Sequence, residues 1–222
     1  MGWWVADLLE SNPALLVSWA VWVIGSIVLH ELAHGWAAIR CGDRTPIELG
    51  HMTWNPVVHM GGMSLIIFFV IGIAWGAMPV NPSRFKGRHD EAIVAAAGPA
   101  MNLGLALLAI ILAGVWSTLF AGVGGDPFHG NVFQFFWVGA MLNLVLMALN
   151  LLPVPPLDGS RILASFSWTL RQLFANPQAQ FATLALLMLL FITGGFGQFF
   201  AVASTVADAG INLVQTILPG GP

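Results

Sequence analysis

ALLVSWAVWVIGSIVLHELAHGWAAI, residues 14–39, is an apolar run in which His30, Glu31 and His34 are the only ionisable side chains. A helix of about twenty apolar residues is long enough to cross the hydrocarbon core of a bilayer. The run therefore predicts a membrane-spanning helix. It also predicts that this helix carries three ionisable side chains in an apolar environment.

The composition of the whole chain agrees with a membrane environment. Of the 222 residues, 58 % are hydrophobic and 8 % are charged, and the formal net charge is −3. A soluble domain carries roughly 25 % charged residues, so this composition excludes a soluble globular domain. It also excludes a disordered chain and a nucleic-acid binder that works through a basic patch. Cys41 is the single cysteine, so no internal disulfide is expected.

Three further apolar stretches are long enough to cross a bilayer. They are residues 92–120, 132–152 and 181–206. A fifth stretch, residues 64–78, is close to the lower length limit and ends at Pro79. It is either a short fifth crossing or a re-entrant hairpin, and only a hairpin packed against protein could satisfy its backbone polar groups at that depth.

The basic residues favour the hairpin. All seven fall in three segments, which follow the first span, precede the second and follow the third: Arg40 and Arg44; Arg84, Lys86 and Arg88; Arg161 and Arg171. Cytoplasmic loops collect Lys and Arg, so the three segments are expected on one side of the membrane. We therefore predict an all-α polytopic membrane protein with about four transmembrane helices and a re-entrant hairpin between the first and second.

The first span contains the pattern H-E-x-x-H at residues 30–34. On a helix, positions i and i+4 share a face, so His30 and His34 present two imidazoles to one point, where zinc can bind, with Glu31 beside it. A charged residue at the centre of a membrane helix costs roughly 2.5 to 3.5 kcal/mol, which favours a functional Glu31. The alternative is that both histidines are neutral packing residues.

A catalytic zinc site takes three protein ligands and leaves one position open. Asp158 is the leading candidate for the third ligand, because prolines 153, 155 and 156 end the third span just before it and let the chain turn inward. Gly159 permits the tight backbone that such a turn needs. Glu91, near the start of the second span, is the rival, because another class of membrane H-E-x-x-H proteases uses a glutamate.

Together these motifs resemble the site-2 protease family of intramembrane zinc metalloproteases. The resemblance covers about residues 14–173 and rests on four elements: His30-Glu31-x-x-His34, Asn150-x-x-Pro153-x-Pro155-x-Leu157-Asp158-Gly159, Gly98-Pro99-Ala100-Met101-Asn102 and Gly61-Gly62. Many relatives have a proline two places before the paired glycines, where this chain has His59, so a role for His59 stays open.

Larger relatives also carry PDZ or CBS domains, and no loop here is long enough to hold one. We therefore expect a minimal form, a single domain over residues 1–222. Its catalytic core covers about 14–173, and a C-terminal helix and tail cover 174–222.

The resemblance implies a zinc-dependent intramembrane endopeptidase that cleaves transmembrane segments of membrane-protein substrates. It implies one zinc ion held by His30, His34 and Asp158, with Glu31 as the general base. It also suggests that Asn150 holds substrate or the developing oxyanion. Asn102 could do the same or bond between helices. The expected partners are the substrate and the lipid bilayer, without nucleic acid, and the active site of this multi-pass protein is expected nearer the cytoplasmic face.

Two other functions stay open: a non-catalytic metal-binding or transport protein, and the glutamate-liganded class of H-E-x-x-H protease. We also make three local predictions. Asn143 is expected to serve packing, and residues 211–218 are expected to form a short surface helix. Residues 48–59, followed by the re-entrant 64–78, are expected to offer an edge on which an unwound substrate adds as a strand.

Overall fold

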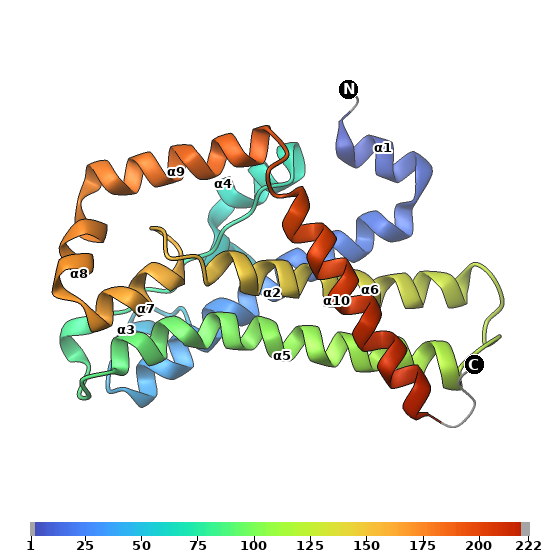
Figure 1. Cartoon of the computed structure of the whole chain (residues 1–222), viewed down its shortest axis with the longest axis horizontal. Helices are drawn as coiled ribbons and strands as arrows, with labels where there is room; N and C mark the ends of the chain where they lie inside the picture. The colour runs from blue at the N-terminus through green and yellow to red at the C-terminus, as the bar shows by residue number, and fades with distance from the viewer. Residues whose placement is uncertain (1–2, 219–222) are drawn as a thin grey trace.

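The computed structural model describes residues 3–218, and no β-strand occurs in that range (Figure 1). The predicted all-α class is confirmed. The helices are α1 (Trp4–Ser11), α2 (Pro13–Arg40), α3 (Thr45–Glu48), α4 (Pro56–Ile71), α5 (Asp90–Leu119), α6 (Phe128–Asn150), α7 (Asp158–Phe166), α8 (Trp168–Ala175), α9 (Pro177–Ile192) and α10 (Gly197–Ile217), with a 3₁₀ turn at Pro82–Arg84.

Four of these helices, α2, α5, α6 and α10, are long and apolar enough to cross a membrane. The first three coincide with the spans predicted from the sequence. A fifth crossing is formed if α8 and α9 act as one span, although the two helices meet at an angle of 73°.

The predicted fourth span, residues 181–206, is wrong as a single helix. α9 ends at Ile192, Gly194 adopts a left-handed backbone with φ +74°, and α10 begins at Gly197. The predicted surface helix at 211–218 is also wrong, because most of it is the end of α10 and Ile211 is buried. The prediction failed because the region is apolar throughout, and hydropathy does not report where a helix ends. Gly194 ends α9 through its left-handed backbone.

The buried core lies between α2, α5 and α6, and α10 packs across α5 and α6 (Figure 1). Small side chains dominate the contact face of α5, where Ala95, Ala106, Ala109 and Ala113 are fully buried. Small residues let membrane helices approach closely, and close approach is what strengthens their packing.

The re-entrant hairpin consists of α4 and an extended segment that runs back along it. α4 bends at Gly61 and ends at Gly72, which has a left-handed backbone. The returning chain is tied to α4 by Ser64, whose hydroxyl bonds both the N–H and the C=O of Trp75. The extended segment therefore lies at residues 73–81 and overlaps the end of the expected substrate-binding edge. Residues 49–55 are also non-helical, and strand addition of a substrate along this edge stays a prediction.

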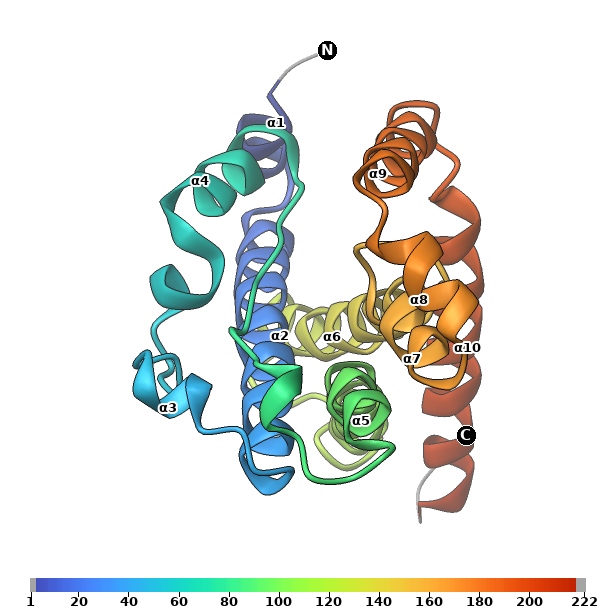
Figure 2. The ribbon, with the colours of Figure 1, turned by 90° about the vertical axis from the view of Figure 1, so that its left-hand side faces the viewer.

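The hairpin leaves and returns at one end of the bundle, as predicted. The backbone N–H of Lys86 donates to the C=O of Cys41 at 3.2 Å, and the N–H of Asn81 donates to the carboxylate of Asp43 at 2.6 Å. Figure 2 shows α3 and α4 on one side of α2, with the returning segment descending towards α5. Because residues 41 and 86 are neighbours, a full crossing between α2 and α5 is excluded.

Candidate metal centre

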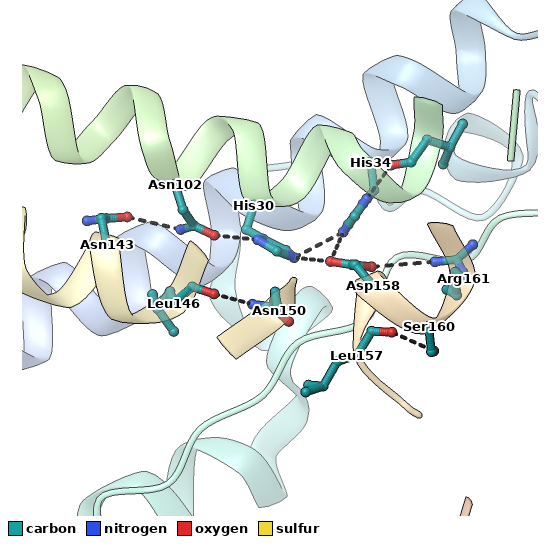
Figure 3. A network of polar contacts seen from close by, with 11 residues as sticks. His30, His34, Asn102, Asn143, Leu146, Asn150, Leu157, Asp158, Ser160 and Arg161 are labelled. Carbon is teal, nitrogen blue, oxygen red and sulfur yellow. Dashed lines mark hydrogen bonds and ion pairs between the residues drawn. The ribbon is translucent and has the colours of Figure 1, made fainter. Parts of the chain in front are cut away.

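His30 and His34 lie one helical turn apart on α2, and Asp158 is the first residue of α7 (Figure 3). The two imidazole Nε2 atoms are 3.0 Å apart. Asp158 Oδ2 lies 3.1 Å from the Nε2 atom of His30 and 3.2 Å from that of His34. Three potential ligand atoms from two distant parts of the chain therefore form a nearly equilateral triangle.

This triangle fits a zinc ion. Tetrahedral zinc with bonds of about 2.0–2.1 Å needs ligand atoms about 3.3 Å apart, close to the three observed edges. Asp158 Oδ2 is buried without a hydrogen-bond donor in the described part of the chain. These three residues are also the only cluster of histidine, cysteine and acidic side chains in that part with suitable ligand geometry.

The end of α6 delivers Asp158 to the histidines, by the route that the prolines predict. α6 ends at Asn150, and a series of turns leads to α7, with the N–H of Leu157 bonded to the C=O of Val154 at 3.0 Å. A Cβ atom on Gly159 would overlap the backbone carbonyls of residues 151 and 152, so this position requires glycine. Arg161 lies behind the carboxylate, 3.9 Å from its other oxygen.

Glu31 is buried next to the histidine pair, with 7 % of its surface exposed. The returning segment of the hairpin passes directly over it at Gly76. A Cβ atom there would lie 2.8 Å from Glu31 Oε1, so only glycine lets the chain approach this closely. The role of Gly76 was not predicted, because its only signal in the sequence is a glycine inside an apolar run.

Gly98 plays a similar steric role on the other side of the centre. A Cβ atom on Gly98 would overlap the Nε2 atoms of both His30 and His34. The glycine of the Gly98-Pro99-Ala100-Met101-Asn102 element therefore lets α5 pack against the two imidazoles. This steric role of Gly98 was not predicted from the sequence.

The Nδ1 atoms of both histidines have acceptors behind them. His34 Nδ1 lies 2.7 Å from the backbone oxygen of Val94, and His30 Nδ1 lies 2.6 Å from Asn102 Oδ1. Asn102 is fully buried and its amide nitrogen donates to Asn143 at 3.0 Å. The amide of Asn102 is thus enclosed between His30 and Asn143, and Asn143, expected to serve packing, is part of this network.

Three other candidate residues lie outside the triangle. Glu91 is paired with Arg171 at 2.6 Å, so the structure brings Asp158, rather than Glu91, to the histidines. His59 bonds the backbone oxygen of Thr53 through Nε2. Asn150 donates to the C=O of residue 146 on its own helix at 3.0 Å (Figure 3).

The fold and the site together define a class: a polytopic helical protein with a buried His-His-Asp centre and an adjacent glutamate among membrane-length helices. Residues 18–126 and 117–193 match Peptidase family M50, and the chain belongs to that family, which includes the site-2 proteases. It is an integral, multi-pass membrane protein.

Named relatives agree with this assignment. The chain is 38 % identical to "Putative zinc metalloprotease YwhC" of Bacillus subtilis over 160 residues, which are 70 % of this chain and 69 % of the relative. It is 32 % identical to "Putative zinc metalloprotease Rip2" of Mycobacterium tuberculosis over 200 residues, 85 % of this chain and 72 % of the relative. No solved structure matches the chain significantly. The chain is thus a homologue of zinc metalloproteases.

Proposed function

We propose that this protein is a zinc-dependent endopeptidase that cleaves transmembrane segments of other membrane proteins. The observation that carries the proposal is the buried triangle of His30, His34 and Asp158 with Glu31 beside it, among helices long enough to cross a bilayer. Membership of family M50 supports the same conclusion. Ionisable groups at such depth are costly and usually functional.

In this proposal His30, His34 and Asp158 hold one zinc ion through Nε2, Nε2 and Oδ2. Zinc in such a site supplies Lewis acidity, which makes water a usable nucleophile near neutral pH. Glu31 accepts the proton of the attacking water and later passes it to the nitrogen of the leaving amine. The burial of Glu31 beneath Gly76 keeps this carboxylate close to the reacting atoms and away from bulk water.

Asn150 is proposed to bind the substrate backbone. One N–H of its side-chain amide bonds its own helix, which holds the group in place and leaves a second N–H free to donate to a substrate carbonyl or oxyanion. Asn102 is proposed to act differently, through His30, because its amide is fully buried behind that imidazole.

We further propose that the centre lies nearer the cytoplasmic face. Arg40 ends α2, Arg88 precedes α5 and Arg161 lies in α7, so basic residues gather at the end of the bundle that holds the site. Cytoplasmic segments collect such residues. The proposed partners are a transmembrane protein substrate and the surrounding lipid.

Glu31→Gln tests the proposed base. The variant is expected to keep wild-type zinc content and to lower cleavage of a panel of co-expressed single-span membrane proteins by at least about a hundredfold. Glu10→Gln, on exposed α1, is the matched control and is expected to cleave like the wild type. Unchanged cleavage by Glu31→Gln would exclude the base. Zinc binding without cleavage of any substrate by the wild type would favour the metal-carrier alternative.

Asp158→Ala and Glu91→Ala together test the third ligand. We expect Asp158→Ala to lose bound zinc during dialysis against a chelator and Glu91→Ala to retain it, as measured by elemental analysis. The assignment of Asp158 is overturned if the two variants exchange these results.

A further inference from the structure

A line of buried polar groups runs from the metal centre into the middle of the bundle. It starts at His30 on α2, passes through Asn102 on α5 and ends at Asn143 on α6, whose side chain bonds the backbone of its own helix (Figure 3). Both asparagines have 0 % exposure. Burying two side-chain amides costs free energy unless their polar atoms are hydrogen-bonded. The bonds between His30, Asn102, Asn143 and Gly139 therefore have to satisfy most of these polar atoms.

The direction of each bond in this line follows from its far end. The C=O of Gly139 can only accept, so the atom of Asn143 that lies 2.9 Å from it must be the amide nitrogen. Asn143 therefore presents its oxygen to Asn102, which must donate through its own nitrogen. The oxygen of Asn102 then faces His30, and His30 must donate from Nδ1.

This order of donors leaves His30 Nε2 unprotonated in the neutral imidazole, with its lone pair aimed at the centre. His34 reaches the same state more simply, because its Nδ1 faces the backbone oxygen of Val94, which can only accept. An asparagine side chain differs from a backbone carbonyl, since its amide can rotate and offer either a donor or an acceptor. Asn102 alone would not determine which atom faces His30.

We propose that Asn143 is a positioning residue for the metal centre, holding the amide of Asn102 in the one orientation that prepares His30 to bind zinc. The inference deepens the proposed function and rests on it for the identity of the metal. Groups that orient a ligating histidine from behind generally change metal affinity by about tenfold to a hundredfold when they are removed. Asn143 would thus control one histidine ligand, His30, and leave the other, His34, unchanged.

The test compares three substitutions at this position. Asn143→Leu removes the bond to Asn102 at similar volume. Asn143→Ser keeps a donor for the C=O of Gly139, so the local bond within α6 is preserved. Its side chain is too short to reach Asn102, so this variant also removes the bond between residues 143 and 102. Asn143→Asp is expected to be protonated at this fully buried position, so that its hydroxyl donates to the C=O of Gly139 and its other oxygen accepts from Asn102. We expect the first two to weaken the dissociation constant for zinc by about tenfold or more, and Asn143→Asp to stay within about threefold of the wild type.

The measurement is zinc affinity of the full chain in detergent, by competition with a chelator, without any cleavage assay. The absorption spectrum of the cobalt-substituted protein reports ligand geometry and is expected to change in Asn143→Ser but not in Asn143→Asp. Asn131→Leu, at the exposed start of α6, is the matched control and is expected to leave both readouts unchanged.

A purely structural role for Asn143 would give a different pattern. Asn143→Leu and Asn143→Ser would lower the unfolding free energy of the zinc-free protein, while zinc affinity and the cobalt spectrum stayed at wild-type values, and this result would overturn the inference. If the wild type binds zinc normally but cleaves no substrate, the proposed function is refuted instead. Failure of the inference about Asn143 and failure of the proposed function are therefore distinguishable.

Discussion

α5 and α9 are both strongly apolar, yet they behave as opposites in the fold. α5 buries a face of small residues against α2, α6 and α10, and that face includes Gly98 and Asn102 of the site. α9 has no buried residue, and its large side chains, such as Phe181 and Ile192, are 74 % and 78 % exposed. Figure 1 shows α9 along the edge of the molecule, apart from the central bundle.

The difference teaches that hydropathy and packing are separate properties of a membrane helix. Lipid tails are as apolar as leucine, so large apolar side chains gain little by leaving lipid for protein. Helices associate where small residues allow their backbones to approach and where polar groups bond between them. α5 presents small residues and Asn102 on its contact face, whereas the alanines of α9 lie on a helix with no buried residue, so one helix builds the site and the other faces outward.

The largest effect is expected at Gly98, where packing and chemistry meet. Gly98→Ala places a methyl group against both imidazoles, so we expect it to weaken zinc affinity at least about a hundredfold. Gly104→Ala, on the exposed face of the same helix with no atom near its Cβ position, is the matched control and is expected to bind zinc normally. Equal zinc affinity in the two variants, measured by chelator competition, would show that the close approach at Gly98 does not matter.

An intermediate effect is expected from enlarging an alanine in the packed region. Ala109 is fully buried on α5, so Ala109→Leu forces side chains apart and should lower the unfolding free energy in bicelles by about 1–3 kcal/mol. Ala185→Leu makes the same change on exposed α9 and should stay within about 0.5 kcal/mol of the wild type. Similar losses from both would mean that α9 is packed as tightly as α5.

The smallest effect concerns the loop that closes the hairpin, outside both helices. Burial raises the pKa of Asp43, but hydrogen bonds from Asn81 and Thr45 and the charge of Arg84 outweigh it and hold the pKa below its usual range. A carboxyl group with a lowered folded-state pKa stabilises the fold above the unfolded-state value, near 3.9, and loses this effect as the pH falls through the folded-state value.

Acidification below about pH 4 should therefore loosen the contact between residues 43 and 81. Hydrogen exchange at the amide of Asn81 is the measurement, and it should speed up as the pH falls beyond the intrinsic pH dependence of exchange. Asp43→Asn should show fast exchange at neutral pH as well, whereas Asp126→Asn, in an exposed loop, should behave like the wild type. Slow exchange at residue 81 in Asp43→Asn would contradict this account.

Much of the architecture was predictable because its signals are local. The apolar runs at α2, α5 and α6 predicted those helices within a few residues, and the positions of the arginines predicted the hairpin. The region of α9 and α10 was mispredicted, because Gly194 breaks the helix without interrupting hydropathy. At the site, the 30–34 motif and the prolines before Asp158 indicated the triangle, and their roles in zinc binding stay predictions.

By itself the sequence determined that the chain lies in lipid, that two imidazoles share a helix face, and that a carboxylate follows a proline-broken span. These properties depend on hydropathy and helical periodicity, and both are determined by residues that are close together in the sequence. Tertiary structure alone decided that Asp158 rather than Glu91 meets the histidines, that Gly76 and Gly98 make room for them, and that Asn143 orients Asn102. Those outcomes depend on how the helices are rotated and spaced relative to one another. Packing between side chains that are far apart in the sequence determines that rotation and spacing.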